Sequence, residues 1–136
     1  MAALHIHPRS AEVFTVLNGT LYTEMVPESG AVDAAGNQRV VKLTLEPQMM
    51  TVFPIGSLHM QMNPGCEPAQ FVAAFTTEDP GAGLIAPETF ALDDDFIVTT
   101  FGGAIAKMDI AKIRKEVPQG PFIRVQECRK KCGLTG

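Results

Sequence analysis

The sequence feature that most constrains the fold is an Asn-Gly pair between two segments in which apolar and polar residues alternate. Asn18-Gly19 separates EVFTVLN, residues 12–18, from TLYTEMV, residues 20–26. An Asn-Gly pair favours a two-residue turn whose twist matches that of two adjacent antiparallel strands. The two segments are therefore predicted to form a β-hairpin.

Further strand-like segments follow at spacings of about ten residues, separated by turn residues. They are RVVKLTL (39–45), MMTVF (49–53), SLHMQMN (57–63) and AQFVAAF (69–75), after a polar loop at 27–38. Many short strands with regular turns are typical of a β-sandwich or a β-barrel. The predicted fold class is therefore an all-β core.

The last part of the chain has a different pattern. Residues 76–92 are predicted to be a long loop, after which the sequence reads as helical, with Asp109 as the expected N-cap of IAKIRKEV and Pro118 ending that helix. We therefore expect a β-barrel over 1–92, followed by a helical extension with a cysteine-containing tail over 93–136.

Length and charge exclude several classes of protein. A chain of 136 residues is long enough for one domain with a core, and no apolar run approaches the ~20 residues that span a bilayer. The net charge of −4 comes without a basic stripe, so neither nucleic acid nor membrane is an expected partner. Met-Ala-Ala-Leu leads directly to His5, which is not a signal peptide, so we expect either an intracellular protein or a piece of a longer precursor.

Three cysteines are too few to define a disulfide framework or a zinc finger. Cys66 stands alone, whereas Cys128 and Cys132 lie four residues apart near the C-terminus. If the tail is helical, a local Cys128–Cys132 bridge would indicate an oxidising compartment. The alternative is two free thiols on a mobile tail.

The stretch LHIHPRSAEVF, residues 4–14, places two histidines and a glutamate close together. In a strand, His5 and His7 point to the same face, and Pro8 forces a turn that lets Glu12 swing back toward them. Two imidazoles and a carboxylate suit a divalent ion such as Mn, Fe, Zn, Ni or Cu. The alternative is a pair of surface histidines on a frayed terminus beside a solvated glutamate.

A second stretch, FPIGSLHMQMN, residues 53–63, adds a third histidine after a Pro-x-Gly turn. Alternation places three polar residues on one face of the strand and three large apolar residues on the other: His59, Gln61 and Asn63 against Leu58, Met60 and Met62. A solvent-facing strand would more commonly carry Lys, Glu or Thr. The pattern therefore indicates a polar interior that holds a metal, with the apolar face packed on another surface.

Together, the two stretches resemble the two cupin motifs. The first motif is matched by His5-x-His7, four residues, Glu12, six residues and Gly19; the second is matched by Pro54-x-Gly56, two residues, His59, three residues and Asn63. The segments HPRSAEVF, HMQMN and TTEDPGAGLIAPETFA resemble germins and fungal spherulin-like proteins. The resemblance runs from residue 4 to about residue 117.

This resemblance implies a jelly-roll β-barrel with C-terminal helices and a divalent metal, often manganese. His5, His7, Glu12 and His59 occupy the positions of the four metal ligands. Asn63 falls where germins place a residue facing the pocket, and Gln61 and Asn63 are expected to orient the substrate.

With manganese, the family oxidises oxalate or dismutates superoxide, so the resemblance favours an oxidoreductase acting on a small molecule. One alternative is a non-redox metal enzyme of fungal secondary metabolism that catalyses isomerisation, cyclisation or dehydration. Another is a storage, adhesion or binding protein that keeps the metal for stability. Bound manganese would favour the oxidoreductase, bound zinc the non-redox enzyme, and a dispensable metal the storage, adhesion or binding protein.

One departure from the family concerns the start of the chain. Relatives usually have several dozen residues before the first histidine, and these supply strands that close the barrel and an early disulfide. We expect either that a neighbouring subunit lends strands or that this is a shortened form with a more open site. The family also implies secretion and a homo-oligomer, either a dimer or a trimer of dimers.

Overall fold

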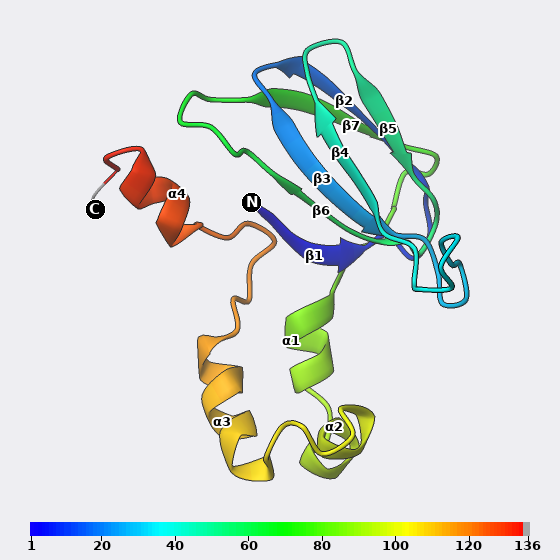
Figure 1. Cartoon of the computed structure of the whole chain (residues 1–136), viewed down its shortest axis with the longest axis vertical. Helices are drawn as coiled ribbons and strands as arrows, with labels where there is room; N and C mark the ends of the chain where they lie inside the picture. The colour runs from blue at the N-terminus through cyan, green and yellow to red at the C-terminus, as the bar shows by residue number, and fades with distance from the viewer. Residues whose placement is uncertain (135–136) are drawn as a thin grey trace.

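The computed structural model describes residues 1–134 and contains two antiparallel sheets that face each other (Figure 1). The larger sheet has the order β4-β3-β6-β1-β8, and the smaller has the order β5-β2-β7. The strands are β1 (Ala2–Ile6), β2 (Glu12–Asn18), β3 (Leu21–Val26), β4 (Val41–Leu45), β5 (Met50–Phe53), β6 (Leu58–Met62), β7 (Gln70–Phe75) and β8 (Gly83–Leu84). The all-β core with C-terminal helices is confirmed.

The predicted hairpin around Asn18-Gly19 is wrong, although both of its strands exist. β2 pairs with β5 and β7 in the smaller sheet, whereas β3 pairs with β4 and β6 in the larger sheet. The turn is therefore a corner that carries the chain from one sheet to the other. Local turn chemistry predicts a reversal, but which strands pair depends on residues far away in the sequence.

The core lies between the sheets and follows from the alternation along their strands. Its buried members come from both sheets: Phe14, Val16, Leu21, Leu45 and Phe53. Phe14 and Val16 point inward from β2, while Thr15 between them faces outward. Burying each of these side chains contributes roughly 1.5–3 kcal/mol, so the inward-facing residues hold the two sheets together.

The expected loop at 76–92 is corrected by the structure, which contains β8 and then α1 (Ile85–Phe90) there. β8 pairs with the end of β1, with Leu84 opposite His5. This strand is only two residues long, so its own sequence carries almost no alternation from which it could be predicted.

Three helices follow α1: α2 (Asp94–Thr100), α3 (Lys107–Glu116) and α4 (Gln126–Lys131). Asp93 caps α2 by accepting a hydrogen bond from the Asp95 amide at 2.9 Å. Asp109 is not the N-cap of α3, because Ala106 has that position and Asp109 lies in the first turn. In that turn its carboxylate still interacts favourably with the helix dipole. α3 ends at Glu116, two residues before Pro118, close to the predicted stop.

No helix in the described part of the chain is long and apolar enough to cross a membrane.

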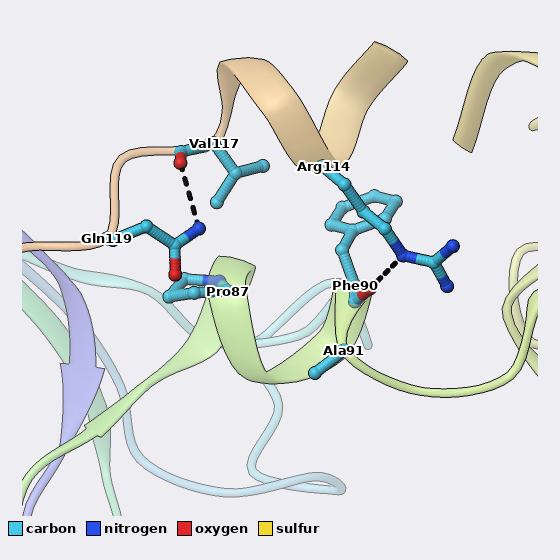
Figure 2. Close-up of a pocket in the computed structure, with 6 residues that line it drawn as sticks. All are labelled: Pro87, Phe90, Ala91, Arg114, Val117 and Gln119. Atoms are coloured by element: carbon cyan, nitrogen blue, oxygen red, sulfur yellow. Dashed lines mark hydrogen bonds between the residues drawn. The ribbon is translucent and has the colours of Figure 1, made fainter. Parts of the chain in front are cut away.

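Arg114 holds α3 against α1 (Figure 2). Its Nε donates to the Phe90 carbonyl at 2.6 Å and its Nη2 to the Leu92 carbonyl at 2.7 Å, and Nη2 also lies 2.7 Å from an Asp94 carboxylate oxygen. A cation is favourable at the C-terminal end of α1, where carbonyls lack partners within the helix. Arg114 is the one cationic residue among the six that line the hollow in Figure 2. Its guanidinium is therefore already occupied in holding the helices together.

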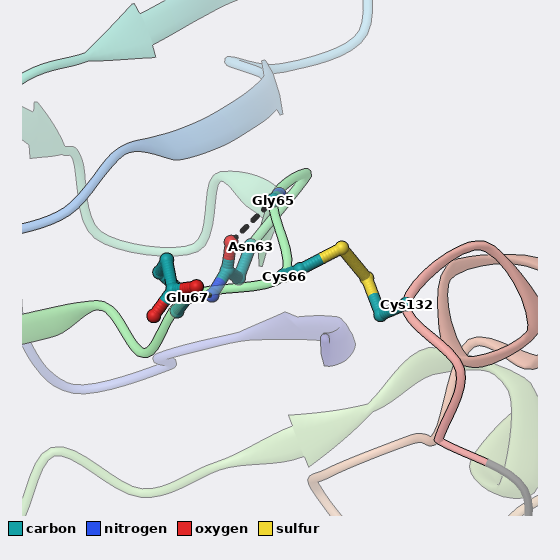
Figure 3. The surroundings of a disulfide bond; sticks show 5 residues. All are labelled: Asn63, Gly65, Cys66, Glu67 and Cys132. Carbon is teal, nitrogen blue, oxygen red and sulfur yellow. Dashed lines mark hydrogen bonds between the residues drawn. A yellow bond between two sulfur atoms is a disulfide. The ribbon is translucent and has the colours of Figure 1, made fainter.

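Both expectations for the cysteines are wrong, since the disulfide joins Cys66 to Cys132 and leaves the Cys128 thiol free (Figure 3). After α3 the chain runs back past the N-terminus to α4 beside the β6–β7 loop (Figure 1). That return brings Cys132 next to a residue 66 positions earlier. No local pattern in the tail could have indicated this partner.

Candidate metal centre

Pairing between β1 and β6 brings the first and third histidines together. In this pairing His5 lies directly opposite His59, and their ring centroids are 4.3 Å apart. His7 follows β1 at the turn that Pro8 begins, and its ring lies 5.0 Å from that of His5. The side-by-side placement expected for His5 and His7 is what the structure shows, and β6 adds His59 beside them.

Glu12 comes from the opposite sheet, as the first residue of β2. One of its carboxylate oxygens, Oε2, lies 3.1 Å from Nε2 of His7 and 3.3 Å from Nε2 of His59. One potential ligand atom from each of His5, His7, Glu12 and His59 lies within 4.8 Å of all the others. His7, Glu12 and His59 are buried, and His5 is half-buried.

Backbone carbonyls set the tautomer of each histidine. Nδ1 of His5, His7 and His59 lies 2.7, 2.6 and 2.8 Å from the carbonyl oxygens of Ala3, Gly81 and Ser57 respectively. A carbonyl can only accept, so each Nδ1 carries the proton and donates it. In the neutral rings Nε2 then keeps its lone pair, which is the arrangement seen in most metal-ligating histidines.

The donor set fits a divalent cation. The lone pairs on Nε2 of His7 and His59 and the lone pairs of the Glu12 carboxylate approach the same point, and they repel one another unless a positive charge lies between them. Burial lowers the pKa of His5, and the hydrogen bond to the Ala3 carbonyl offsets this only in part. The neutral imidazole that a metal requires is therefore favoured at His5.

A cavity of about 220 Å³ opens next to these residues and reaches His5, His7 and Glu12. Most of its wall is apolar: Ala2, Phe71, Ala73, Phe75, Ala82, Leu84, Pro121 and Phe122. Phe71 and Phe75 point inward from β7 yet remain 43% and 36% exposed, so the cavity is open to solvent on this side. The ring of Phe53 stacks on His59 at 4.2 Å from behind and keeps water from that face.

Comparison with known proteins agrees with this geometry. The sequence model of the cupin family matches residues 1–107. The chain belongs to the cupin family. The confirmed resemblance covers both motifs and all four potential metal ligands.

Two groups of sequence relatives place this cupin more narrowly. Spherulin-1A of the slime mould Physarum polycephalum is 34% identical over 96% of the chain, and germin-like protein 12-2 of rice, Oryza sativa subsp. japonica, is 37% identical over 71% of it. The cupin is thus germin-like and spherulin-like. It spans about half the length of these relatives, since the alignments cover 50% and 43% of them.

Solved structures show the same fold at low sequence identity. An oxalate oxidase superposes with a TM-score of 0.72 at 19% identity, covering 87% of this chain and 57% of the oxidase. An oxalate decarboxylase of Bacillus subtilis gives 0.73 at 15% identity, covering 91% and 30%. At this identity, the superpositions establish the fold alone.

Gln61 and Asn63, the residues expected to contact substrate, have different surroundings in this cupin. Gln61 is buried and lines the cavity, and its side-chain amide makes no hydrogen bond to the described residues. The Asn63 amide instead donates to the Glu67 carbonyl at 2.7 Å and accepts from the Gly65 amide at 2.8 Å (Figure 3). Asn63 therefore stabilises the loop after β6, and its contact with substrate stays a prediction.

Sequence reasoning missed the residues that support and enclose the site. The carbonyls of Ala3, Ser57 and Gly81 orient the imidazoles, and Phe122 comes from the C-terminal segment to line the cavity. Gly81 had a signal in DPGAG, a segment whose Pro and Gly indicate a turn. Phe122 had none, because its neighbours in space lie at the opposite end of the chain.

Proposed function

We propose that this cupin is a manganese-dependent oxidoreductase of the germin type, with the ion held by His5, His7, Glu12 and His59. The observation that carries the proposal is the convergence of three imidazole Nε2 atoms and one carboxylate beside an open cavity. Four protein ligands leave coordination positions free on an ion that accepts six, as catalytic sites do. The substrate class we propose is superoxide or a small carboxylate such as oxalate.

The bound manganese would supply a redox-active centre and an open position for the substrate's oxygen atom. The chain's own residues do the rest. The carbonyls behind the histidines hold the rings in one orientation, and Glu12 offsets one of the ion's two positive charges. Gln61 offers a free amide to the cavity, which suits a hydrogen bond to a bound carboxylate or to superoxide. The phenylalanines around the entrance limit the water near the reacting atoms.

Support for carboxylate substrates comes from the structural neighbours, which act on oxalate as their names state. Support for manganese comes from the resemblance to germins, because manganese is often the metal in that family. The matched spherulin comes from a slime mould and the germin-like protein from rice, so these relatives do not indicate a fungal source for this chain.

The test begins with elemental analysis of the purified protein, followed by reloading of metal-free protein with manganese or zinc. Manganese-loaded protein should dismutate superoxide, or oxidise oxalate to carbon dioxide while dioxygen is reduced to hydrogen peroxide, and metal-free protein should do neither. A His59→Ala variant treated in the same way serves as the control for free manganese. Full activity in stripped protein would overturn the proposal. Zinc in the purified protein, with no redox activity on reloading with manganese, would favour the non-redox alternative.

A further inference from the structure

The segment between α3 and α4, Pro118–Val125, here called the C-terminal strap, lies along the N-terminal strand of the metal site. The Ala3 amide donates to the Pro121 carbonyl and the Ile123 amide to the Met1 carbonyl, each at 2.8 Å. Ala2 and Phe122 face each other as an antiparallel bridge. The strap therefore extends the larger sheet by a short piece beside β1, the strand that holds His5.

The strap also forms part of the site's wall. Pro121 and Phe122 line the cavity that reaches His5, His7 and Glu12. Phe122 lines a second cavity of about 140 Å³ as well, and Gln61 lines both cavities. At 74% exposed, its ring stands at the entrance rather than in the interior. A molecule that approaches the four ligands from this side passes Phe122.

Hydrogen bonds to Met1 and Ala3 anchor the strap, and the disulfide that follows it adds a covalent anchor. Cys132 ends α4 and is bonded to Cys66 in the loop that follows β6. β6 carries His59 and Gln61, so one covalent bond ties α4, the helix that follows the strap, to the loop after a strand of the site (Figure 3). Without it, three hydrogen bonds at a sheet edge would remain: the two above and one at 3.0 Å from the Met1 N-terminal nitrogen to the Ile123 carbonyl. Segments held by few hydrogen bonds at an exposed edge open readily.

We propose that the C-terminal strap forms one side of the entrance to the metal site, with Phe122 controlling what reaches the ligands, and that the Cys66–Cys132 disulfide holds the strap in place. The inference rests on the proposed metal site for its biological meaning, but not for its test. Cleavage of the disulfide should free the strap and widen the entrance without altering the four ligands.

The three histidines of the chain offer a direct measurement, because all of them belong to the site. Diethyl pyrocarbonate acylates neutral imidazole nitrogen, so its reaction rate with metal-free protein reports access to the cavity. We expect the rate to rise several-fold in Phe122→Ala and in the double variant Cys66→Ser/Cys132→Ser. Phe96→Ala is the matched control, since Phe96 is equally exposed on α2 and does not line the cavity.

Wild-type protein treated with dithiothreitol provides a second route that needs no substitution. The reagent closes to its cyclic disulfide as Cys66 and Cys132 become thiols, and the histidine rate should rise as in the double variant. Thermal melts establish that each protein is folded at the assay temperature. Hydrogen exchange at the Ala3 and Ile123 amides should quicken over the same treatment.

Unchanged histidine rates after loss of the disulfide, in folded protein, would overturn the proposal. A rate that rises equally in Phe96→Ala would overturn it too, because the effect would then be general loosening. Added manganese separates this test from that of the proposed function. If manganese slows the reaction of diethyl pyrocarbonate with the histidines in none of the proteins, the metal assignment is wrong. The reaction rates in metal-free protein still decide the role of the strap.

Discussion

His59 is the most buried of the four proposed ligands, and its removal is the clearest test of the metal centre. A His59→Ala variant loses one donor and leaves a buried space beside Phe53, so we expect it to lose most of its bound metal. Glu12→Gln keeps shape but loses the negative charge, and it should weaken binding while the fold persists. Metal content by elemental analysis, with circular dichroism for folding, measures both. Full metal content in His59→Ala would show that the site lies elsewhere.

Acid should release the metal, because protons and the ion compete for the same lone pairs. The proton-bound form gains population as pH falls, so metal content should fall with pH and recover on neutralisation. For His5 the lowered pKa moves its own protonation to a more acidic range, so it resists this competition. Equilibrium dialysis against manganese over a pH series measures the effect. A metal content that rises on acidification would contradict the ligand set.

Gly81 supports the site through its backbone. Its φ of +67° is unfavourable for any side chain, and its carbonyl accepts a hydrogen bond from His7 Nδ1. A Gly81→Ala substitution should shift that carbonyl and weaken manganese binding by roughly 10- to 100-fold, the usual effect of losing a ligand's hydrogen-bond partner. Gly102→Ala, at φ +60° in open space far along the helical part, is the control. Equal affinities in the two variants would argue against this role of Gly81.

The corner between β2 and β3 depends on Gly19. Its φ is +77°, and a Cβ there would lie 2.9 Å from the Ala69 backbone. Gly19→Ala should destabilise the fold by about 1–3 kcal/mol from conformation alone, and by more from the clash. Gly36→Ala, at φ +82° with open space around it, isolates the conformational cost. Urea denaturation of both variants should show the larger loss for Gly19→Ala, and a smaller loss would mean that the corner adapts.

An oligomer remains the expectation at the scale of the whole molecule, although a different surface now supports it. Leu58, Met60 and Met62 are half-buried. The smaller sheet instead presents an apolar outer face, on which four side chains are 45% to 56% exposed: Leu17, Met50, Val52 and Val72. Soluble monomers rarely expose a contiguous patch of this kind. The helical part adds Phe96 and Met108, which are also exposed.

Sedimentation at micromolar concentration should therefore give a mass above the 14.6 kDa of one chain. Lysine at Val52 and Val72 would place charges in the proposed contact, so the Val52→Lys/Val72→Lys variant should sediment as a monomer. Thr44→Lys, on the outer face of the larger sheet, is the control and should leave the oligomer intact. If the wild-type protein sediments as a monomer, the apolar outer face of the smaller sheet stays exposed to water and the proposed contact does not form.

What the sequence by itself determined is local: where most of the strands lie, which way their side chains alternate, and which residues have the chemistry to bind a metal. Period-two alternation places His5 and His7 on one face of their strand and His59 and Gln61 on one face of theirs, and the resemblance to the two cupin motifs assigns both pairs to a single site. These features depend on neighbours within a few residues, so they can be read without the fold.

Only the tertiary structure decided what depends on distant partners. It pairs β2 and β3 with different strands, joins Cys66 to Cys132 rather than Cys128 to Cys132, and brings Phe122 to the entrance of the site. It also commits the Asn63 amide to its own loop. The physical reason is common to these cases: each contact forms only when burial of the core between the two sheets has folded the chain back on itself, and no local pattern records that return.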